Sequence, residues 1–171
     1  MPAAKTRAEL FSYLDQLAIK TQTLDHPAVF TVAESTAIAE ALPGGHTKNL
    51  FLKDAKDQLF LVVALDKTAV DLKQLPRAIG SARLSFGKAE LLSEVLGISP
   101  GSVTVFSLIN DPGQRVSVVL DEALMAHETI NAHPLENTAT TGIARADLLR
   151  FIAACGHVPK IVKLETAGSG A

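Results

Sequence analysis

A glycine-rich turn followed by a lysine is the first segment that could take part in chemistry. It runs Pro43-Gly44-Gly45-His46-Thr47-Lys48-Asn49 and leads directly into the apolar residues Leu50-Phe51-Leu52. A nucleotide-binding P-loop needs a helix after its lysine, whereas these apolar residues predict a strand, so this is not a nucleotide-hydrolase loop. The segment then offers the ammonium group of a lysine at the start of a strand. There Lys48 could meet a phosphate as a point charge, or it could be an ordinary exposed loop lysine.

A second turn containing glycine lies between an expected helix and an expected strand. Its residues, Gly97-Ile98-Ser99-Pro100-Gly101-Ser102-Val103-Thr104, could direct several backbone N–H groups outward together. Such a cluster binds an anion or a developing oxyanion. The alternative is a plain turn in which glycine supplies an unusual backbone dihedral angle. The local sequence favours neither interpretation.

A polar stretch between an apolar strand and the last helix is the third candidate. Six of the ten residues in 132–141 carry polar side chains, which is unusual for a segment expected to cross a small domain. His133 could donate a hydrogen bond to a ligand, or it could anchor the turn at Pro134. Both interpretations stay open on the sequence alone.

Several other kinds of chemistry lack the residues that they need. The five histidines never have the i, i+4 spacing of a helical zinc motif, and Cys155 is the one cysteine. We expect Cys155 to be a buried structural thiol on the apolar face of the last helix. No G-x-S-x-G nucleophile elbow is present. The sequence therefore predicts no metal site and no cofactor.

Length and composition limit the class of protein. The chain has 171 residues, is 47% hydrophobic, and carries 16 Lys and Arg against 18 Asp and Glu. This length fits one domain, and the net charge of -2 excludes a histone-like nucleic-acid binder, although not a local basic patch. No apolar run reaches the roughly 18 residues that span a bilayer, and the first residues become polar too soon for a signal peptide. We expect a cytoplasmic protein that does not enter membranes, in a reducing compartment.

The hydrophobic pattern indicates the elements that must position the three candidate segments. Helices are expected over 6–20, which begins with the capping-box spacing Thr6 to Glu9, and over 31–42, 71–79, 87–96 and 145–155. Strands are expected over 21–26, 48–53, 58–65, 103–109, 115–120, 128–132, 138–141 and 158–164.

The strand pattern predicts the type of sheet. Residues 48–65 and 103–120 look like two hairpins, and Leu59–Leu65 is apolar enough to be a central strand covered on both faces. Hairpins imply antiparallel pairing, so we expect a mixed α/β or α+β fold and not a doubly wound parallel sheet. We assign 1–166 to one domain and 167–171 to a disordered tail.

Taken together, these segments resemble the YbaK/prolyl-tRNA editing family, whose members hydrolyse mischarged aminoacyl-tRNA. The resemblance rests on ordered blocks that begin at His26-Pro27-Ala28-Val29-Phe30-Thr31 and continue through His46–Leu52, Pro100–Thr104, Asn137–Thr141 and Cys155-Gly156-His157. These blocks look most like the freestanding branch that clears alanine from proline tRNA. The resemblance implies a curved, mixed and largely antiparallel sheet, flanked by helices, around a pocket.

The resemblance also implies roles for individual residues. Lys48 corresponds to the family lysine required for deacylation, and residues 101–105 correspond to a G-x-x-x-P substrate loop in which Val105 replaces the usual proline. His133 matches a polar position of the pocket. The implied catalytic residues are Lys48, Gly101 and Ser102, and the implied substrate-binding residues are Thr31, Thr47, Asn49, Leu50, Pro100, Val103, Thr104 and His133.

The implied activity is metal-free hydrolysis of alanine from proline tRNA, with the charged acceptor end of the tRNA as partner and prolyl-tRNA synthetase as a further candidate partner. One alternative is a deacylase for cysteine or another small residue on tRNA. A second is a regulatory module that binds tRNA or another nucleic acid without catalysis. Basic residues that could contact the tRNA body are Lys53, Arg77, Arg83, Lys88 and Arg115.

Overall fold

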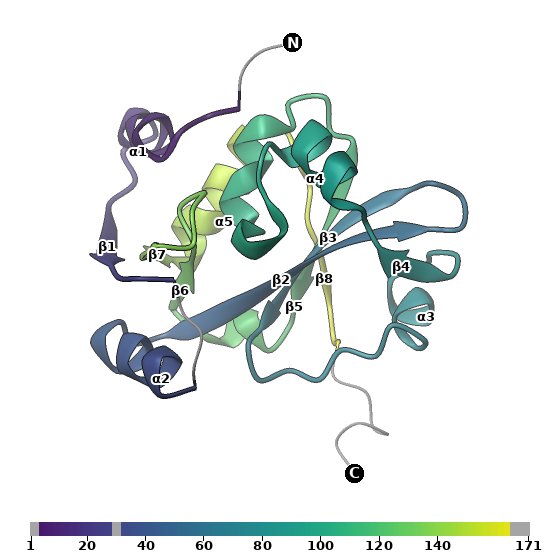
Figure 1. The fold of residues 1–171 in the computed structure, drawn as a ribbon, viewed down its shortest axis with the longest axis horizontal. Helices are drawn as coiled ribbons and strands as arrows, with labels where there is room; N and C mark the ends of the chain where they lie inside the picture. Colours follow the sequence, from purple (N-terminus) through teal and green to yellow (C-terminus); the bar gives the residue numbers. More distant parts are fainter. Residues whose placement is uncertain (1–3, 29–31, 165–171) are drawn as a thin grey trace.

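One eight-stranded mixed sheet organises the protein, seen in a computed structural model that describes residues 4–28 and 32–164 (Figure 1). The strand order is β1-β7-β6-β2-β3-β5-β8, and β4 pairs with β2 beside this path. The strands are β1 (Thr21–Asp25), β2 (Gly45–Asp54), β3 (Leu59–Leu65), β4 (Leu84–Phe86), β5 (Val116–Asp121), β6 (Thr129–Ala132), β7 (Ala139–Ala144) and β8 (Lys160–Val162).

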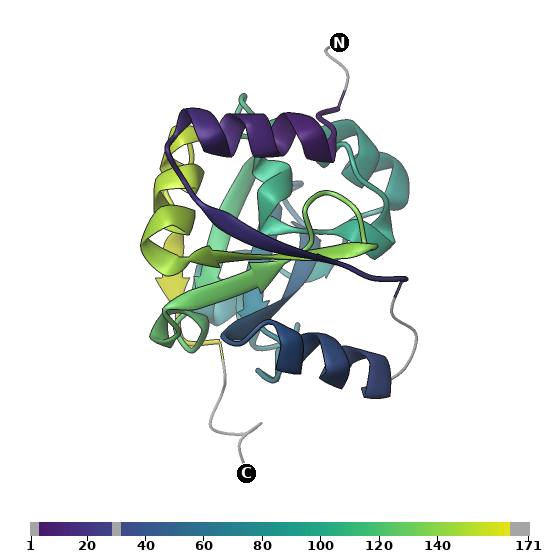
Figure 2. The same ribbon diagram turned by 90° about the vertical axis from the view of Figure 1, so that its left-hand side faces the viewer.

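Helices cover both sides of this sheet. They are α1 (Arg7–Gln16), α2 (Val32–Ala41), α3 (Leu75–Ile79), α4 (Ala89–Leu96), α5 (Arg145–Ala154) and the 3-10 helices η1 (Pro100–Ser102), η2 (Val105–Asn110) and η3 (Leu124–Ala126). Figure 2 shows α1 on one side of the β1–β7–β6 part of the sheet and α2 on the other. The expected tail, 167–171, lies outside the described residues.

The pairing of the strands confirms a mixed sheet with mostly antiparallel pairs. The pairs β1–β7, β6–β7, β2–β3 and β2–β4 are antiparallel, whereas β2–β6, β3–β5 and β5–β8 are parallel. The expected hairpin of β2 and β3 is confirmed, with Phe51 opposite Leu61. The expectation for β3 is confirmed too, because its residues from Leu59 to Ala64 are buried.

The second expected hairpin, over 103–120, is wrong. Residues Val105–Asn110 form a 3-10 helix, and β5 pairs in parallel with β3 and β8. The Thr104 hydroxyl caps η2 by accepting a hydrogen bond from the Phe106 amide at 3.3 Å. A short apolar run fits a buried strand or a buried helical turn equally well, so this local cap and the packing of the core decide the outcome.

Helix boundaries follow local signals where these are strong. The capping box of α1 is confirmed, since the Glu9 amide donates to the Thr6 hydroxyl and the Thr6 amide donates to the Glu9 carboxylate. This helix ends at Gln16, before the expected Lys20, because Ala18 has a left-handed φ of 58°. As expected, Gly97 closes α4, with a φ of 66°.

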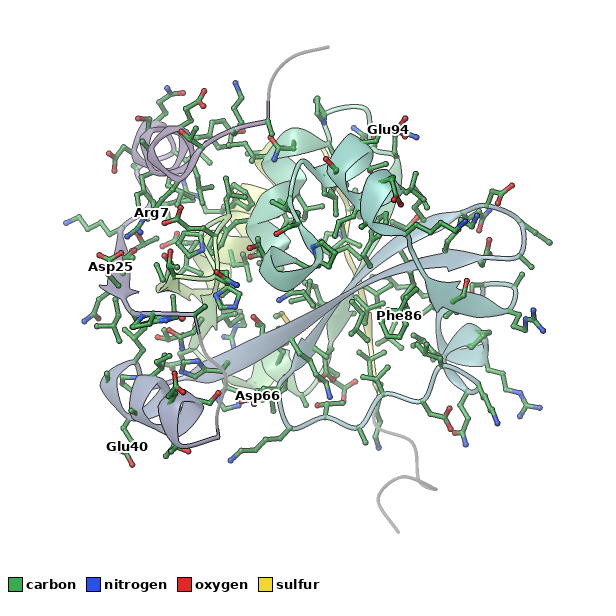
Figure 3. All side chains as sticks on the ribbon, in the orientation of Figure 1. Arg7, Asp25, Glu40, Asp66, Phe86 and Glu94 are labelled. Atoms are coloured by element: carbon green, nitrogen blue, oxygen red, sulfur yellow. The ribbon has the colours of Figure 1, made fainter. Side chains whose placement is uncertain are left out.

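Two apolar clusters lie on opposite faces of the sheet. The larger packs α1, α4, α5 and η2 against the sheet, and within it the rings of Phe106 and Phe151 meet edge to face at 5.5 Å. The smaller lies around α3 and includes Leu52, Phe60 and Val62. On β4, a strand that the sequence did not indicate, the Phe86 side chain is 63% exposed (Figure 3).

Gly87 is a point of close approach between β4 and the larger cluster. A methyl group added there would lie 2.3 Å from the buried ring of Phe51. We therefore expect Gly87→Ala to lower the free energy of unfolding by about 1–3 kcal/mol, because a packed aromatic ring cannot move aside cheaply. Urea denaturation measures this change. The control is Gly113→Ala, where nothing lies within 4 Å of the added methyl; equal stability of the two variants would contradict the prediction.

Candidate active site

Lys48 lies within β2 and not at the start of the strand. The strand begins at Gly45, three residues earlier than expected, because Gly45 and His46 pair with β6. Lys48 stands opposite Ala64 and Asn49 opposite Val63 in an unbroken antiparallel register. Because side chains alternate along a strand, Lys48 and Asn49 point to opposite faces of the sheet.

The Lys48 face is the one that carries α2. His46, which lies on the same face as Lys48, pairs with Asn131 of β6, and Asn131 pairs with Gly142 of β7. Thr140, two residues before Gly142 in β7, therefore lies on this face too. The His46 ring donates from Nε2 to the backbone oxygen of Leu42, just after α2, at 2.7 Å. Leu50, two residues beyond Lys48, packs against the smaller apolar cluster.

His26 also joins the Lys48 face, although the sequence indicated it only as part of the family resemblance. Its Nε2 lies 2.9 Å from the Thr140 hydroxyl, and its Nδ1 donates to the Pro27 carbonyl oxygen at 2.8 Å. If Nδ1 carries the proton of the neutral ring, Nε2 accepts from Thr140. No pattern in the sequence could have paired these residues, because they lie 114 positions apart.

Thr47 and Asn49 lie on the opposite face, among groups that fix the strands. The Thr47 hydroxyl donates to the backbone oxygen of Asn131 at 2.9 Å, and the Asn49 amide donates to Thr47 at 3.3 Å. The Asn49 Oδ1 atom is buried and has no hydrogen-bond partner among the described residues. The Thr47 bond links β2 to β6, whereas the Asn49 bond joins two side chains of β2.

The Pro100–Thr104 turn is built differently from the expected ring of outward amides. Pro100–Ser102 is one turn of 3-10 helix, in which the Ser102 amide donates to the Ser99 oxygen at 2.9 Å. That amide is therefore already used within the turn. Gly101 is exposed, and a methyl group added there would meet Asn137 Nδ2 at 3.4 Å. Of the two amides, Gly101 is thus the better placed to meet a ligand.

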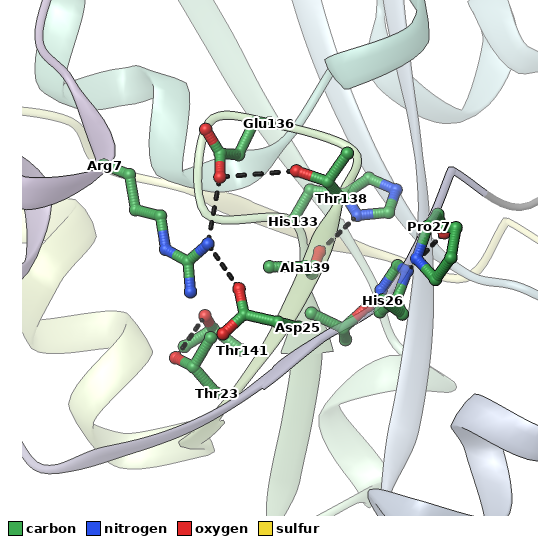
Figure 4. Close-up of polar contacts among 11 residues, drawn as sticks. Arg7, Thr23, Asp25, His26, Pro27, His133, Glu136, Thr138, Ala139 and Thr141 are labelled. Carbon is green, nitrogen blue, oxygen red and sulfur yellow. Dashed lines mark hydrogen bonds and ion pairs between the residues drawn. The ribbon is translucent and has the colours of Figure 1, made fainter.

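The turn is bonded to the loop that carries His133. The buried Thr104 hydroxyl donates to the His133 backbone oxygen at 2.6 Å. The His133 ring donates from Nδ1 to the Ala139 oxygen at 3.0 Å, as Figure 4 shows. The His133 ring therefore anchors its own loop through Nδ1.

The structure thus brings together the second and third candidate segments, Pro100–Thr104 and the loop after β6. It places Lys48 on the neighbouring strand β2 and on the sheet face that His26 and Thr140 share. Thr31 lies outside the described residues. Within the part of the chain that the structure describes, no group of three or more His, Cys, Asp or Glu is arranged to hold a metal ion, and no helix is long and apolar enough to cross a membrane.

Comparison with known proteins identifies the family. The sequence profile of the aminoacyl-tRNA editing domain matches residues 26–151, which is most of the chain. The chain belongs to the aminoacyl-tRNA editing domain family. This confirms the resemblance inferred from the sequence, and residues 26–151 of this editing domain include the Lys48, Gly101 and His133 segments.

Two curated relatives align with nearly the whole editing domain. A Danio rerio protein named prolyl-tRNA synthetase associated domain-containing protein 1 is 40% identical over 161 residues, covering 93% of this chain and 88% of the relative. The prolyl-tRNA editing protein ProX of Acetoanaerobium sticklandii is 36% identical over 152 residues, covering 88% and 93%. A solved structure described as a putative trans-editing enzyme for prolyl tRNA synthetase has the same fold, with a TM-score of 0.66 at 21% identity over 93% of this chain and 98% of that one.

The single thiol of this editing domain is poorly suited to attack. Cys155 follows α5, is half-buried and packs against the larger apolar cluster. Burial raises the pKa of this thiol to about 12. Since the thiolate is the nucleophilic form, almost none is present near neutral pH.

The Thr104 hydroxyl couples the two candidate loops of the editing domain. Thr104→Val removes the donor to the His133 oxygen and the acceptor for the Phe106 amide. We expect this variant to lose about 1–3 kcal/mol of unfolding free energy, because buried polar groups are left unpaired. Chemical denaturation measures the loss. Thr104→Ser keeps the hydroxyl, loses only the methyl group, and is expected to retain most of the stability; a Thr104→Val variant as stable as Thr104→Ser would contradict the prediction.

Proposed function

We propose that this chain is a free-standing deacylase that hydrolyses alanine from mischarged proline tRNA. The observation that carries the proposal is the family match over residues 26–151, which spans Lys48, the Gly101 turn and the His133 loop. The names of the two relatives support proline tRNA as the substrate and a prolyl-tRNA synthetase as a partner. We place the activity in the cytoplasm, since a single free cysteine suits a reducing compartment.

The reaction needs little beyond positioning and polarisation. An aminoacyl ester is already activated, so a water molecule can attack its carbonyl carbon while the ester C–O bond breaks and the ribose oxygen takes up a proton. Donors held toward the carbonyl oxygen stabilise the charge that develops there, and removing one such donor costs roughly 2.7–4 kcal/mol in known enzymes. We assign this role to the Gly101 side of the turn, because the Ser102 amide is used within it.

Lys48 binds the acceptor end in this proposal. Its ammonium group meets the terminal phosphate or ribose as a point charge. His133 Nε2 contributes a polar contact in the pocket. Thr47 and Asn49 remain substrate-binding residues in this proposal, and Thr47 in addition ties β2 to β6.

The chemistry in this proposal uses no metal and no covalent nucleophile. The raised pKa of Cys155 argues against a thiolate. The buried carboxylate of Asp111 accepts hydrogen bonds from His157 and from the amides of Arg115 and Val116, so it serves the fold.

Selection for alanine has a physical reason. A synthetase pocket built for proline cannot reject a smaller apolar side chain by more than about 1–3 kcal/mol. A second pocket that admits alanine and excludes proline removes the error. Such a pocket must be small, which agrees with a site bounded by a tight 3-10 turn and a short loop.

The decisive experiment is a deacylation panel with alanyl-, cysteinyl- and seryl-tRNA carrying proline-tRNA sequences. We expect alanine to be released fastest. Lys48→Ala is expected to reduce release on the order of 10²-fold or more, because it removes a charged contact to the reacting end. The matched control is Lys56→Ala at the exposed tip of the β2–β3 hairpin, which is expected to behave like the wild type.

Each other outcome of the panel selects an alternative. Cysteine or serine as the fastest substrate would change the substrate of the proposed enzyme. Binding of tRNA that survives Lys48→Ala without any turnover would indicate the non-catalytic module. Wild-type inactivity on every charged tRNA would overturn the proposal.

Gly101 offers a separate test, because its surroundings tolerate a methyl group. The nearest atom to the added carbon is Asn137 Nδ2 at 3.4 Å, and Gly101 does not have a left-handed φ. We expect Gly101→Ala to keep the melting temperature of the wild type while deacylation falls about 10-fold or more, since the methyl group occupies the space that the ester needs. Thermal unfolding and initial deacylation rates measure the two effects, and unchanged rates would remove Gly101 from the site.

A further inference from the structure

We propose that Arg7 is a positioning residue that fixes the 133–138 loop against the Gly101 turn. The proposal rests on the proposed function, because the loop and the turn are its candidate substrate site. Arg7 lies in the first turn of α1, outside the 26–151 region that defines the family. No motif in the sequence indicated a role for it.

Arg7 joins two segments that are far apart in the chain. A single nitrogen, Nη1, lies 2.6 Å from Asp25 Oδ1 at the end of β1 and 2.9 Å from Glu136 Oε1 in the loop (Figure 4). The Thr138 hydroxyl also reaches the same Glu136 oxygen, at 3.4 Å. Figure 3 shows Arg7 and Asp25 on the side of the molecule formed by α1 and β1.

The loop adopts a backbone conformation that needs such support. Leu135, directly before Glu136, has a φ of 72°, in the left-handed region that a bulky side chain disfavours. The base of the loop is held from inside by the Thr104–His133 and His133–Ala139 hydrogen bonds. Glu136 projects beyond this base, and the ion pair with Arg7 holds that part of the loop to α1.

Arg7 is itself held in place before it meets the loop. Its guanidinium carbon lies 5.5 Å from the centre of the Phe11 ring, and its side chain is 24% exposed. Hydrogen bonds to Asp25 and Glu136 raise the pKa of Arg7. The hydrogen bond from Arg7 in turn lowers the pKa of the Asp25 carboxyl below its usual value. With two carboxylates on one guanidinium, this group carries no surplus positive charge for a tRNA phosphate.

The loop position matters for the site at two points. His133 lies at its start, and Asn137 is the nearest neighbour of a methyl group added at Gly101. Releasing Glu136 from Arg7 would let Asn137 shift relative to the turn, while the bonds of His133 stay in place. A shift of about 1 Å at a reacting centre can cost up to 10²-fold in rate, so the effect belongs in kcat more than in tRNA binding.

The test compares Arg7→Met with Arg150→Met in the full chain. Arg150 is a matched control, because it too pairs with a carboxylate, Asp147 at 2.9 Å, and donates to the Leu17 oxygen at 2.6 Å, away from the loop. We expect Arg7→Met to lower kcat for alanine release about 10-fold, with KM and its salt dependence unchanged. Amide hydrogen exchange should become faster in 134–138 and stay unchanged in β2 and β3. Arg7→Lys, which keeps a cation between the carboxylates, should recover part of the rate.

A second variant separates positioning from general damage. Glu136→Ala breaks the same contact from the loop side, so the double variant with Arg7→Met should be no slower than either single variant. Additive losses, or an Arg7→Met variant that matches Arg150→Met in rate and exchange, would overturn the inference. If Arg7→Met raised KM and lowered by about one unit the slope of log tRNA affinity against log salt concentration, the inference would also be overturned, because that result indicates a phosphate contact. If the wild type deacylates no charged tRNA, the proposed function fails. Faster amide exchange of Arg7→Met confined to 134–138 would then still support the positioning role of Arg7, and unchanged exchange in that variant would overturn it.

Discussion

The register of β2 is the constraint on which the rest of the structure depends. This strand pairs in parallel with β6 at its start and antiparallel with β3 and β4 further on, so it joins the two halves of the sheet. Because the register with β3 is unbroken, each side chain of β2 has a fixed face. Lys48 is thereby directed to the face shared with Thr140 and His26, whereas Thr47 and Asn49 lie on the other face, where Thr47 bonds to β6.

Around this rigid strand, the candidate site is completed by short loops held by few polar contacts. The Thr104 hydroxyl, the His133 ring and the Arg7 guanidinium each make one connection that the loops need. Such an arrangement separates two roles of the fold. The apolar clusters on both faces hold helices and sheet together, and the polar contacts fix where the loops lie.

Much of the fold could be predicted because its signals are local. The capping box at Thr6, the glycine that ends α4 and the apolar run of β3 each act within a few residues, and each was found where the sequence indicated. The second hairpin was wrong for a physical reason. Residues 103–109 are mostly apolar, and periodicity cannot separate a buried strand from a buried helical turn. The parallel pairing of β5 with β3 and β8 depends on the whole sheet, so no local pattern predicts it.

The sequence by itself determined the family, since the order and spacing of several short blocks are properties of the chain alone, and the match over 26–151 agrees with them. It also indicated which segments carry polar groups. The tertiary structure decided which of those groups share a face and which residues hold them. Arg7 and Glu136 are 129 positions apart, as His26 and Thr140 are 114 apart. Pairs at such separations form only when the sheet brings β1, β7 and the loop before β7 side by side, and backbone pairing across the sheet, not the spacing along the chain, sets that arrangement.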